Sequence, residues 1–227
     1  MQDSFDLLFA LRSLGYLQSA RDPLWWPQSG TFEVVVGAIL TQQSRWEKVE
    51  ASLSRLKAAN LLTLDALAAA DPQKIASLIK PSGFYNTKGQ RVIKLCENIL
   101  ESFGSFDTFV REVDREWLLA QKGIGMESAD SILCYACHRP VFVVDSYTQR
   151  LLGAFGYAFE SYLEIQEWMQ RGIEENHQKI QEMYGCKTDL AVVYARFHGK
   201  IVEYAKKHIR GRQVDVMPIV KVLEKSR

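Results

Sequence analysis

The residues best suited to chemistry lie in one stretch of the chain, from Trp117 to Gly156. Within it, Gly123-Ile124-Gly125 is a two-glycine turn, a composition that a helix interior disfavours. Apolar helical patterns before and after this turn predict a helix, a tight hairpin and a second helix. The second helix leaves its first N–H groups unsatisfied, and glycines let another molecule approach the backbone closely. We therefore expect the hairpin to bind a phosphate group.

A carboxylate follows Gly125 by twenty residues. Asp145 comes directly after the short apolar run Val141 to Val144 and precedes another apolar-periodic helix that begins near Ser146. Such an aspartate can be a plain helix N-cap. It can also be a carboxylate held at the mouth of a cleft, and the residues alone leave both interpretations open.

Helices are predicted for most of the chain around these residues. The segment 31–44 is apolar nearly all round; its β-branched residues would allow a strand, but its length favours a helix. Asp71 precedes Pro72 and is predicted to cap a helix. The tail from Gly211 is left without an assignment. The other helices are expected at 4–17, 46–60, 63–70, 71–79, 87–103, 108–113, 114–121, 127–137, 162–177 and 187–208.

The hairpin and the aspartate together resemble a known family. The pattern L-x-x-x-K-G-I-G from Leu118 to Gly125, followed by Val143-Val144-Asp145, resembles the endonuclease III superfamily of helix-hairpin-helix DNA glycosylases. The likeness is greatest to the bacterial 3-methyladenine DNA glycosylase III class. It extends over nearly the whole chain, through the segments WWP, L-T-Q, S-G-F-Y-N, D-R-E-W-L-L, E-S-A-D, I-L-C-Y-A-C and Y-A-R-F-H-G-K-I-V-E.

The resemblance implies an all-α protein with two helical lobes and the helix-hairpin-helix at the cleft between them. One lobe is expected at 1–27 plus 141–227, and the other, a helical barrel that ends in the hairpin, at 28–140. The catalytic aspartate of the family falls on Asp145. The hairpin that grips the DNA backbone falls on five residues: Lys122, Gly123, Ile124, Gly125 and Ser128.

Two departures from the family pattern change the expected chemistry. Bifunctional members carry a nucleophilic lysine where this chain has Glu127, so no Schiff base is expected and the enzyme should be monofunctional. Glu127 is interpreted as a helix-capping or supporting residue, with a hydrogen bond near the base pocket as the alternative. The family's iron–sulfur motif C-x6-C-x2-C-x5-C is missing, because Cys186 is the last cysteine. We therefore expect no 4Fe-4S cluster and no required cofactor, with a monovalent cation at the hairpin as an option.

A metal site is the alternative interpretation of Cys134-x-x-Cys137-His138. No second ligand pair accompanies it in the sequence, and unpaired cysteines are among the most buried residues. We interpret these cysteines as thiols in or near the core and expect no metal.

Aromatic residues are expected to form the base pocket. By resemblance, Trp25, Trp26 and Pro27 make one wall and Trp46 faces it, whereas the residues alone would equally suit core anchors and helix packing. Lys206 would project toward the pocket, although an ammonium there repels a cationic base unless a carboxylate or water intervenes.

Three further residues receive a role from the resemblance or from their pattern. Gln42 is expected to fill the gap left by an extruded base. Lys88 is expected to reach a DNA phosphate, with a solvated surface lysine as the alternative. Lys200 lies among Phe197, Ile201 and Val202 and is expected to be partly buried, structural and open to carbamylation by CO2.

Composition sets limits on partners and location. The chain has 227 residues, 47% of them hydrophobic, and a formal net charge of +1, which is low for a nucleic-acid binder. The segment 199–227 carries eight Lys or Arg and three acids, so a basic end could face phosphate or simply be a solvated helix. The N-terminus does not resemble a signal peptide and no apolar run is long enough for a membrane, so the protein is expected to be cytoplasmic. A monomer is the default expectation.

The function that these features predict is excision of alkylated purines, above all 3-methyladenine, from double-stranded DNA. Two alternatives stay open: a glycosylase for another lesion, and a non-catalytic helix-hairpin-helix DNA-binding protein.

Overall fold

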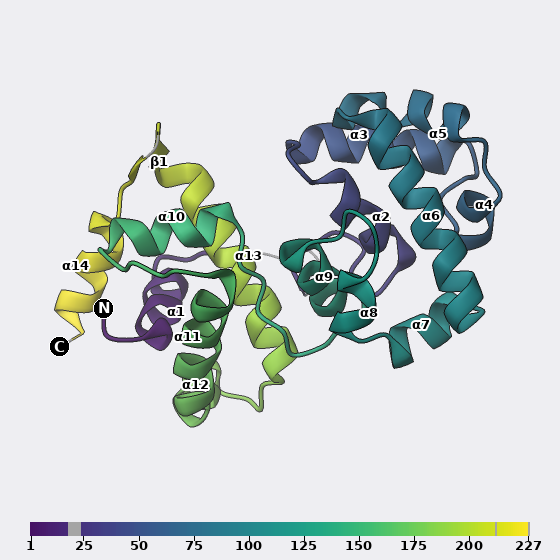
Figure 1. Ribbon diagram of the computed structural model, residues 1–227. Coiled ribbons are helices and arrows are strands. Elements are labelled where there is room, and N and C mark those ends of the chain that lie inside the picture. The colour runs from purple at the N-terminus through teal and green to yellow at the C-terminus, as the bar shows by residue number, and fades with distance from the viewer. Residues whose placement is uncertain (18–23, 212, 227) are drawn as a thin grey trace. The chain divides into compact units, whose positions relative to one another are not determined.

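The computed structural model describes residues 1–17, 24–211 and 213–226, and helices dominate this part of the chain (Figure 1). The predicted all-α fold is confirmed. The strands among the described residues are two short ones, β1 (Ile209–Arg210) and β2 (Gln213–Val214), which pair with each other. The chain divides into two compact units. We call Met1–Pro27 with His138–Arg227 the terminal unit, and Gln28–Cys137 the central unit. The second boundary is three residues before the expected one at 140/141.

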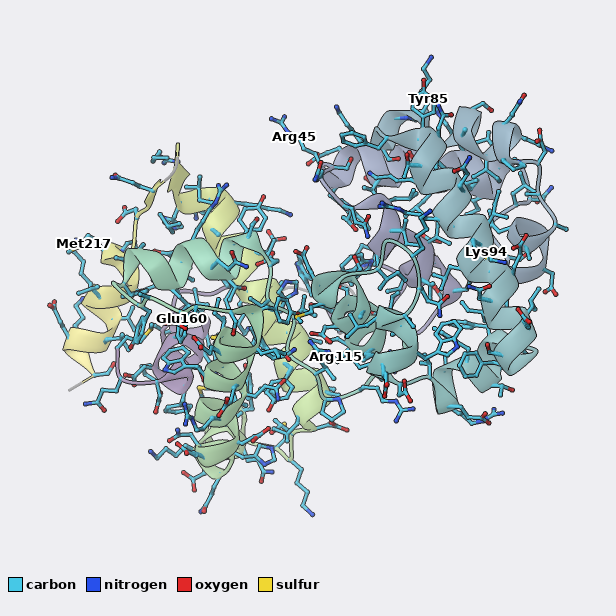
Figure 2. All side chains as sticks on the ribbon, in the orientation of Figure 1. Arg45, Tyr85, Lys94, Arg115, Glu160 and Met217 are labelled. Atoms are coloured by element: carbon cyan, nitrogen blue, oxygen red, sulfur yellow. The ribbon has the colours of Figure 1, made fainter. Side chains whose placement is uncertain are left out.

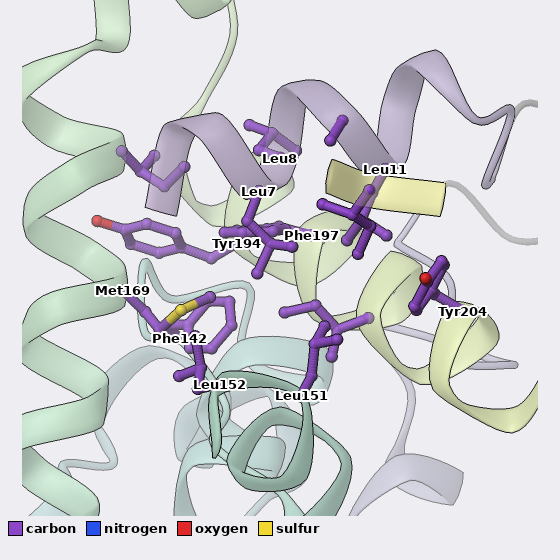
Figure 3. Packing of buried hydrophobic residues seen from close by; sticks show 14 of the residues in the cluster. Leu7, Leu8, Leu11, Phe142, Leu151, Leu152, Met169, Tyr194, Phe197 and Tyr204 are labelled. Carbon is purple, nitrogen blue, oxygen red and sulfur yellow. The ribbon is translucent and has the colours of Figure 1, made fainter. Parts of the chain in front are cut away.

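The terminal unit is a bundle of helices around one apolar core (Figure 3). Its long helix α13 packs against α1 and α10, and α1 also contacts α11 and α14. The core residues drawn in Figure 3 include Leu7, Leu8, Leu11, Phe142, Leu151, Leu152, Met169, Tyr194, Phe197 and Tyr204. The helices are α1 (Ser4–Ser13), α10 (Ser146–Ala154), α11 (Tyr162–Glu175), α12 (His177–Tyr184), α13 (Leu190–His208) and α14 (Met217–Lys225).

The central unit is built around the buried helix α2 and the long amphipathic helix α6. Eight of the nine residues of α2 are buried, which explains why its sequence is apolar all round and confirms a helix rather than a strand. Its elements are α2 (Phe32–Leu40), α3 (Trp46–Ala58), α4 (Leu64–Ala68), α5 (Pro72–Leu78), η1 (Lys80–Ser82), α6 (Tyr85–Phe103), α7 (Phe106–Glu112), α8 (Arg115–Leu119), α9 (Met126–Ser131) and the π-helix η2 (Ile132–Ala136).

Capping side chains explain where several helices begin. Asp71 accepts hydrogen bonds from the N–H groups of the first turn of α5, as predicted. Ser105 caps α7 in the same way, so that helix starts two residues before the predicted 108. Asp189 caps α13 at Leu190 rather than at 187. These shifts follow from caps that the hydrophobic pattern does not register.

Other differences involve whole elements. The predicted continuous helix 127–137 changes from α to π geometry at Ile132. The first helix ends at Ser13, before Gly15, which has a φ of 85°. Helix α12 was not predicted, and the tail after Gly211 forms β2 and α14. No helix in the described part of the chain is long and apolar enough to cross a membrane.

Candidate functional site

Asp145 is the N-cap of α10 and keeps one carboxylate oxygen outside the cap. Its Oδ1 accepts hydrogen bonds from the Thr148 backbone N–H at 2.8 Å and from the Thr148 hydroxyl at 3.0 Å. Its Oδ2 lies 3.5 Å from Nε2 of His198 on α13. The N-cap interpretation is therefore confirmed. The second interpretation also stays open, since capping uses only Oδ1.

The surroundings of Asp145 favour its ionised form. Burial alone would raise the pKa of this carboxyl, but the hydrogen bond and charge of His198 and the two hydrogen bonds from Thr148 outweigh it. The pKa of Asp145 consequently lies below its usual value. The side chain is 13% exposed, so a largely dehydrated carboxylate is kept ionised near the surface of the terminal unit.

Trp25 is held against α13 in a conformation that requires a glycine beneath it. A Cβ on Gly199 would lie 2.3 Å from Trp25 Cγ, which no side chain could tolerate without displacement of the indole. Trp25 itself has a φ of 78°, a left-handed conformation that is costly for a bulky residue. Its indole Nε1 donates to Glu203 at 3.1 Å, one helical turn beyond Gly199. The strained backbone of Trp25 is therefore offset by contacts that hold its indole ring in one position.

The ring of Trp25 contacts both His198 and Lys206 of the terminal unit. The His198 ring meets it edge-on at 5.4 Å between centroids. The Lys206 ammonium lies 5.8 Å from the Trp25 centroid and 4.0 Å from the Glu203 carboxylate. Asp145, His198, Trp25, Glu203 and Lys206 thus form one continuous cluster, which we call the aspartate–tryptophan cluster.

The rest of the WWP segment divides between core and surface. Trp26 is buried, with 7% of its surface exposed, and meets Trp25 at 89° and 6.4 Å between centroids. Pro27 is exposed. Of the two tryptophans, Trp26 therefore serves as a core anchor and Trp25 is the half-buried ring of the cluster.

Lys200 is deeply buried in the terminal unit, with 3% of its surface exposed. Its Nζ donates to the Tyr16 carbonyl at 2.9 Å, which ties α13 to the segment after α1. Burial, followed by the charges of Arg196 and Arg12, lowers the pKa of Lys200 to about 8. The expected structural role agrees with this placement, and burial is more complete than predicted.

In the central unit, the predicted hairpin is formed as a tight turn between α8 and α9. Gly123 has a φ of 84°, and Gly125 is the extended N-cap of α9. A bidentate pair between Arg115 on α8 and Asp130 on α9, with contacts of 2.7 and 2.8 Å, fixes the two helices to each other. The hairpin therefore has a rigid base.

The side chains of the hairpin differ in what they can contact. Lys122 is exposed, whereas Ile124 and Ser128 are each only 7% exposed. Ile124 consequently anchors the turn in the unit, and it can meet a ligand through its backbone rather than through its side chain. The Gly123 carbonyl accepts a hydrogen bond from Gln42, so a cation at the hairpin would have to compete for that oxygen.

Gln42 fastens the end of α2 to the hairpin. Its Nε2 donates to the Gly123 carbonyl at 2.9 Å and to the Ser128 hydroxyl at 3.0 Å. Its Oε1 accepts from Arg91 Nη1 at 3.0 Å. The Gly123 carbonyl can only accept and Arg91 can only donate, which fixes the orientation of this amide. Both N–H groups of Gln42 are thus committed within the protein.

The prediction for Lys88 is wrong in both of its forms. Lys88 is 2% exposed, and its Nζ donates to the carbonyls of Leu40 and Ser82 at 2.8 Å each. It therefore ties the end of α2 to the start of α6, and its ammonium is neither at the surface nor accessible to a DNA phosphate. Burial, followed by the charge of Arg91, lowers the pKa of Lys88 to about 8.

Two exposed residues of the central unit were missed although their backbone is strained. Gln43 has a φ of 52° with an exposed side chain, and Phe84 has a φ of 46° with 67% of its surface exposed. Strained backbone of this kind clusters at functional sites. The sequence gives no periodic signal for either residue, because both lie just outside helices.

Other residues of the site became visible only in the structure. His198, Gly199, Glu203 and Arg91 contact the predicted residues but were given no role. A glycine inside the apolar helical pattern around Gly199 is a usable signal for close packing. The remaining predicted pocket residues lie in the central unit: Trp46 starts α3 and is half-buried, and Glu127 is exposed in the first turn of α9.

Three of the four cysteines are buried, as expected for thiols in or near the core. Cys96 and Cys134 are buried, and burial raises the pKa of the Cys96 thiol to about 12 and that of Cys134 still further. Among the described residues, no group of three or more His, Cys, Asp or Glu side chains is placed to hold a metal ion. The structure thus offers no support for the metal interpretation of Cys134-x-x-Cys137.

Comparison with known proteins places this geometry in a family. Residues 36–175 match the HhH-GPD superfamily of base excision DNA repair proteins. A protein of Methanocaldococcus jannaschii, provisionally named a DNA repair glycosylase, is 36% identical over 203 residues, which cover 86% of each chain. Endonuclease III of Thermotoga maritima is 28% identical over 57% of this chain and 59% of its own.

Solved structures agree with this assignment. The crystal structure of H. pylori 3-methyladenine DNA glycosylase bound to 1,N6-ethenoadenine has a TM-score of 0.88 and 45% identity, covering 92% of this chain and 99% of that one. A non-covalent complex of endonuclease III with DNA has a TM-score of 0.69 over the whole chain, at 17% identity, and shows the shared fold. The chain therefore belongs to the HhH-GPD superfamily of base excision DNA repair proteins.

Proposed function

We propose that the protein is a monofunctional DNA glycosylase that removes alkylated purines, above all 3-methyladenine, from double-stranded DNA. The observation that carries the proposal is the aspartate–tryptophan cluster, in which one helix, α13, positions both a carboxylate and an aromatic ring. The similarity to the H. pylori 3-methyladenine glycosylase supports the substrate class. A base hidden in the duplex must first be flipped out of the stack before the cluster can act on it.

Trp25 suits the base that leaves. 3-Methyladenine is cationic while it is still attached to its sugar, and an aromatic face attracts a cation by roughly 0.5–2 kcal/mol. The Lys206 ammonium near this ring would oppose such a base, but the Glu203 carboxylate lies 4.0 Å from it and offsets its charge. Glu203 is thus the intervening carboxylate that a productive Lys206 requires.

Asp145 suits the sugar. As the glycosidic bond breaks, positive charge develops on the sugar ring, and a fixed carboxylate stabilises it. Because Thr148 holds Oδ1, Oδ2 is the oxygen that would face the reacting sugar or the attacking water, through the lone pair that it does not direct at His198. The base leaves with the bonding electron pair, which neutralises its own charge, so little acid catalysis is needed at the base.

Glu127 supports hydrolysis without strand cleavage. A glutamate offers no amine for a Schiff base, so the covalent step that leads to β-elimination has no nucleophile at this position. The predicted roles of Glu127 beside the base and of Trp46 in the pocket stay predictions. The lack of a 4Fe-4S cluster likewise stays a prediction.

Gln43, rather than Gln42, is the better residue to fill the space of an extruded base. Gln42 has both N–H groups committed to Gly123 and Ser128, whereas Gln43 is exposed in a strained conformation next to it. A neutral amide can hydrogen-bond to an orphaned base without adding charge. In this arrangement Gln42 acts as the support that presents its neighbour.

Base release is the experiment that tests the proposal. Methylated duplex DNA is incubated with the wild-type protein and with Asp145→Asn, free 3-methyladenine and 7-methylguanine are measured, and borohydride trapping is run in parallel. We expect release of 3-methyladenine, a rate on the order of 10²–10³ lower in Asp145→Asn, and no trapped complex. Asparagine can still cap α10, so the variant should fold and bind DNA.

Other outcomes would overturn the proposal in different ways. A trapped covalent complex would show a lyase. Release of a different damaged base alone would show a glycosylase for another lesion. DNA binding without any release or trapping would favour a non-catalytic DNA-binding protein.

A further inference from the structure

We propose that a groove between α6 and the hairpin is a second DNA-backbone site, which holds phosphates next to the one at the hairpin. The proposal rests on the proposed function, because it takes duplex DNA as the partner. The groove lies entirely within the central unit and has a volume of about 270 Å³. It is lined by Thr87, Gln90, Arg91, Lys94, Leu95 and Asn98 from α6 and by Gln121, Lys122 and Ile124 from the hairpin.

The charge of the groove favours an anion. Three of the nine lining residues are cationic: Arg91, Lys94 and Lys122. The other six are neutral, so the lining, all of it in the described part of the chain, contains no carboxylate. The whole protein carries a net charge of only +1, which makes such a segregation of positive charge informative.

The groove is held open by contacts at its two ends. Asn98 Nδ2 donates to Gln121 Oε1 at 2.7 Å and joins α6 to the segment that leads into the hairpin. At the other end, Arg91 donates to Gln42 and lies against Gly123, where a Cβ would come within 2.3 Å of its Nε. The walls are therefore fixed before any ligand arrives, which lowers the cost of binding.

The cations of the groove have donors to offer. The planar guanidinium of Arg91 has five N–H groups and uses one of them on Gln42. Lys122 is exposed. Lys94 projects from α6 (Figure 2) and pairs with Glu97 at 3.0 Å, but both side chains are largely exposed, and such pairs contribute little. A phosphate can therefore compete for Lys94.

The dimensions match more than one phosphate. Residues 91 to 98 of α6, between the two fixed ends, span about 10 Å at 1.5 Å per residue. Phosphates of one strand follow each other at about 3.4 Å along the duplex axis. The groove is thus long enough for several consecutive nucleotides of the strand that the hairpin grips, rather than for a single free phosphate.

The test is the salt dependence of duplex DNA binding, measured by fluorescence anisotropy with the full-length protein. Each lost phosphate contact lowers the slope of log K against log salt by roughly 0.9. We expect Lys94→Gln to lower the slope by about that amount and Lys94→Gln/Lys122→Gln by about twice as much. The matched control is Lys57→Gln/Lys74→Gln, which removes two exposed lysines of the same unit outside the groove and should leave the slope unchanged.

The single and double variants separate the groove from the hairpin. If Lys122→Gln lowers the slope and Lys94→Gln does not, only the hairpin binds phosphate and the proposed groove is refuted. Equal slopes for the groove and control pairs would refute it as well. Thermal unfolding of each variant checks that the fold is kept, and neither lysine is buried.

The groove and the proposed function can also fail separately. Base release by the wild-type protein decides the substrate. A lowered slope without release of methylated bases would keep the groove and reject the alkylpurine substrate. Release of methylated bases by the wild-type protein, together with an unchanged salt slope in the groove variants, would support the substrate and refute the groove.

Discussion

The aspartate–tryptophan cluster of the terminal unit and the hairpin region of the central unit share one packing feature but expose different groups. In both, a glycine admits a large side chain that a Cβ would displace: Gly199 beneath Trp25 and Gly123 beneath Arg91. In the terminal unit the side chain is an indole ring with a buried carboxylate nearby. In the central unit it is a guanidinium at the end of an open cationic groove.

The difference between the two regions concerns exposure of charge. Asp145 is nearly buried, contacts His198 and has a lowered pKa. These properties suit a group that stabilises developing positive charge in a site shielded from water. Lys94 and Lys122 are exposed, as groups must be that exchange counterions for phosphates. We therefore assign chemistry to the first region and DNA binding to the second, and the following variants would break or sharpen that division.

Gly199→Ala should have the largest effect after Asp145→Asn. Alanine is about 1 kcal/mol better than glycine in a helix, but the new methyl group must displace Trp25, and such overpacking costs about 1–3 kcal/mol. We expect thermal stability to change little while 3-methyladenine release falls at least roughly tenfold, a loss of about 1.4 kcal/mol in transition-state stabilisation. Single-turnover base release and calorimetry on the same samples would measure both.

The control for this variant lies in the same unit. An alanine methyl group at Gly153 in α10 would meet nothing within 4 Å, so Gly153→Ala should raise stability by up to about 1 kcal/mol and leave base release unchanged. If Gly199→Ala releases base as fast as Gly153→Ala, catalysis does not require the packing of Trp25 against α13, and the assignment of Trp25 to the base pocket is refuted.

Gly123→Ala should affect binding rather than chemistry. The position has a φ of 84° and lies against Arg91, so alanine would strain the turn and push the guanidinium away from Gln42. We expect DNA affinity to fall roughly tenfold, or about 1.4 kcal/mol, with a smaller change in the single-turnover rate at saturating enzyme. Gly89→Ala in α6 is the control, since its methyl group would make ordinary contacts with Ile75. A larger effect on rate than on affinity would contradict the division.

Much of this arrangement could be predicted from the sequence, for a physical reason. Helical periodicity follows from burial of one face, and the hairpin and Asp145 stand out because two glycines and an acid after an apolar run are locally unusual. The family and the all-α fold were therefore recognised correctly. The cap at Asp145 was also among the two interpretations given.

Long-range packing could not be predicted in the same way. Lys88 reads as a surface lysine because its sequence neighbours are polar, yet its ammonium replaces water with the carbonyls of Leu40 and Ser82, the first of them 48 residues away. His198 and Glu203 gain their roles only when α13 is placed beside Asp145 and Trp25. Such contacts depend on tertiary structure and leave no periodic pattern.

His198→Phe should shift the pH range of activity. Phenylalanine keeps a ring against Trp25 but removes the hydrogen bond and the charge that lower the pKa of Asp145, while the burial that raises it remains. The pKa of Asp145 should therefore rise, so activity is lost at a higher pH on acidification than in the wild-type protein. The stabilisation that ionised Asp145 gives the folded state, present at neutral pH and lost as the pH falls through its folded pKa, should shrink accordingly.

The pH profile of single-turnover base release would measure this shift, with denaturant unfolding at the same pH values. Thr148→Val is a useful second variant, because it removes the hydroxyl bond to Oδ1 and keeps the backbone one. It should shift the profile in the same direction but by less. An unchanged acidic limb in His198→Phe would show that His198 does not set the ionisation of Asp145.

The smallest effect is expected at the two buried lysines, one in each unit, which sharpen the comparison through what surrounds them. Both lysines have a pKa near 8 in the folded protein. Between about pH 8 and the higher pKa of the unfolded chain, only the unfolded chain binds the proton, so the free energy of unfolding rises with pH. Lys88 donates to two carbonyls, which would repel a carbamate. Lys200 donates to one and feels the charges of Arg196 and Arg12, which would stabilise it. Labelled bicarbonate should therefore modify Lys200 and not Lys88, and NMR would detect the labelled carbamate. The signal should disappear in Lys200→Met and remain in Lys88→Met. A signal that remains in Lys200→Met, or no signal in the wild-type protein, would show that Lys200 is unmodified and only links α13 to Tyr16.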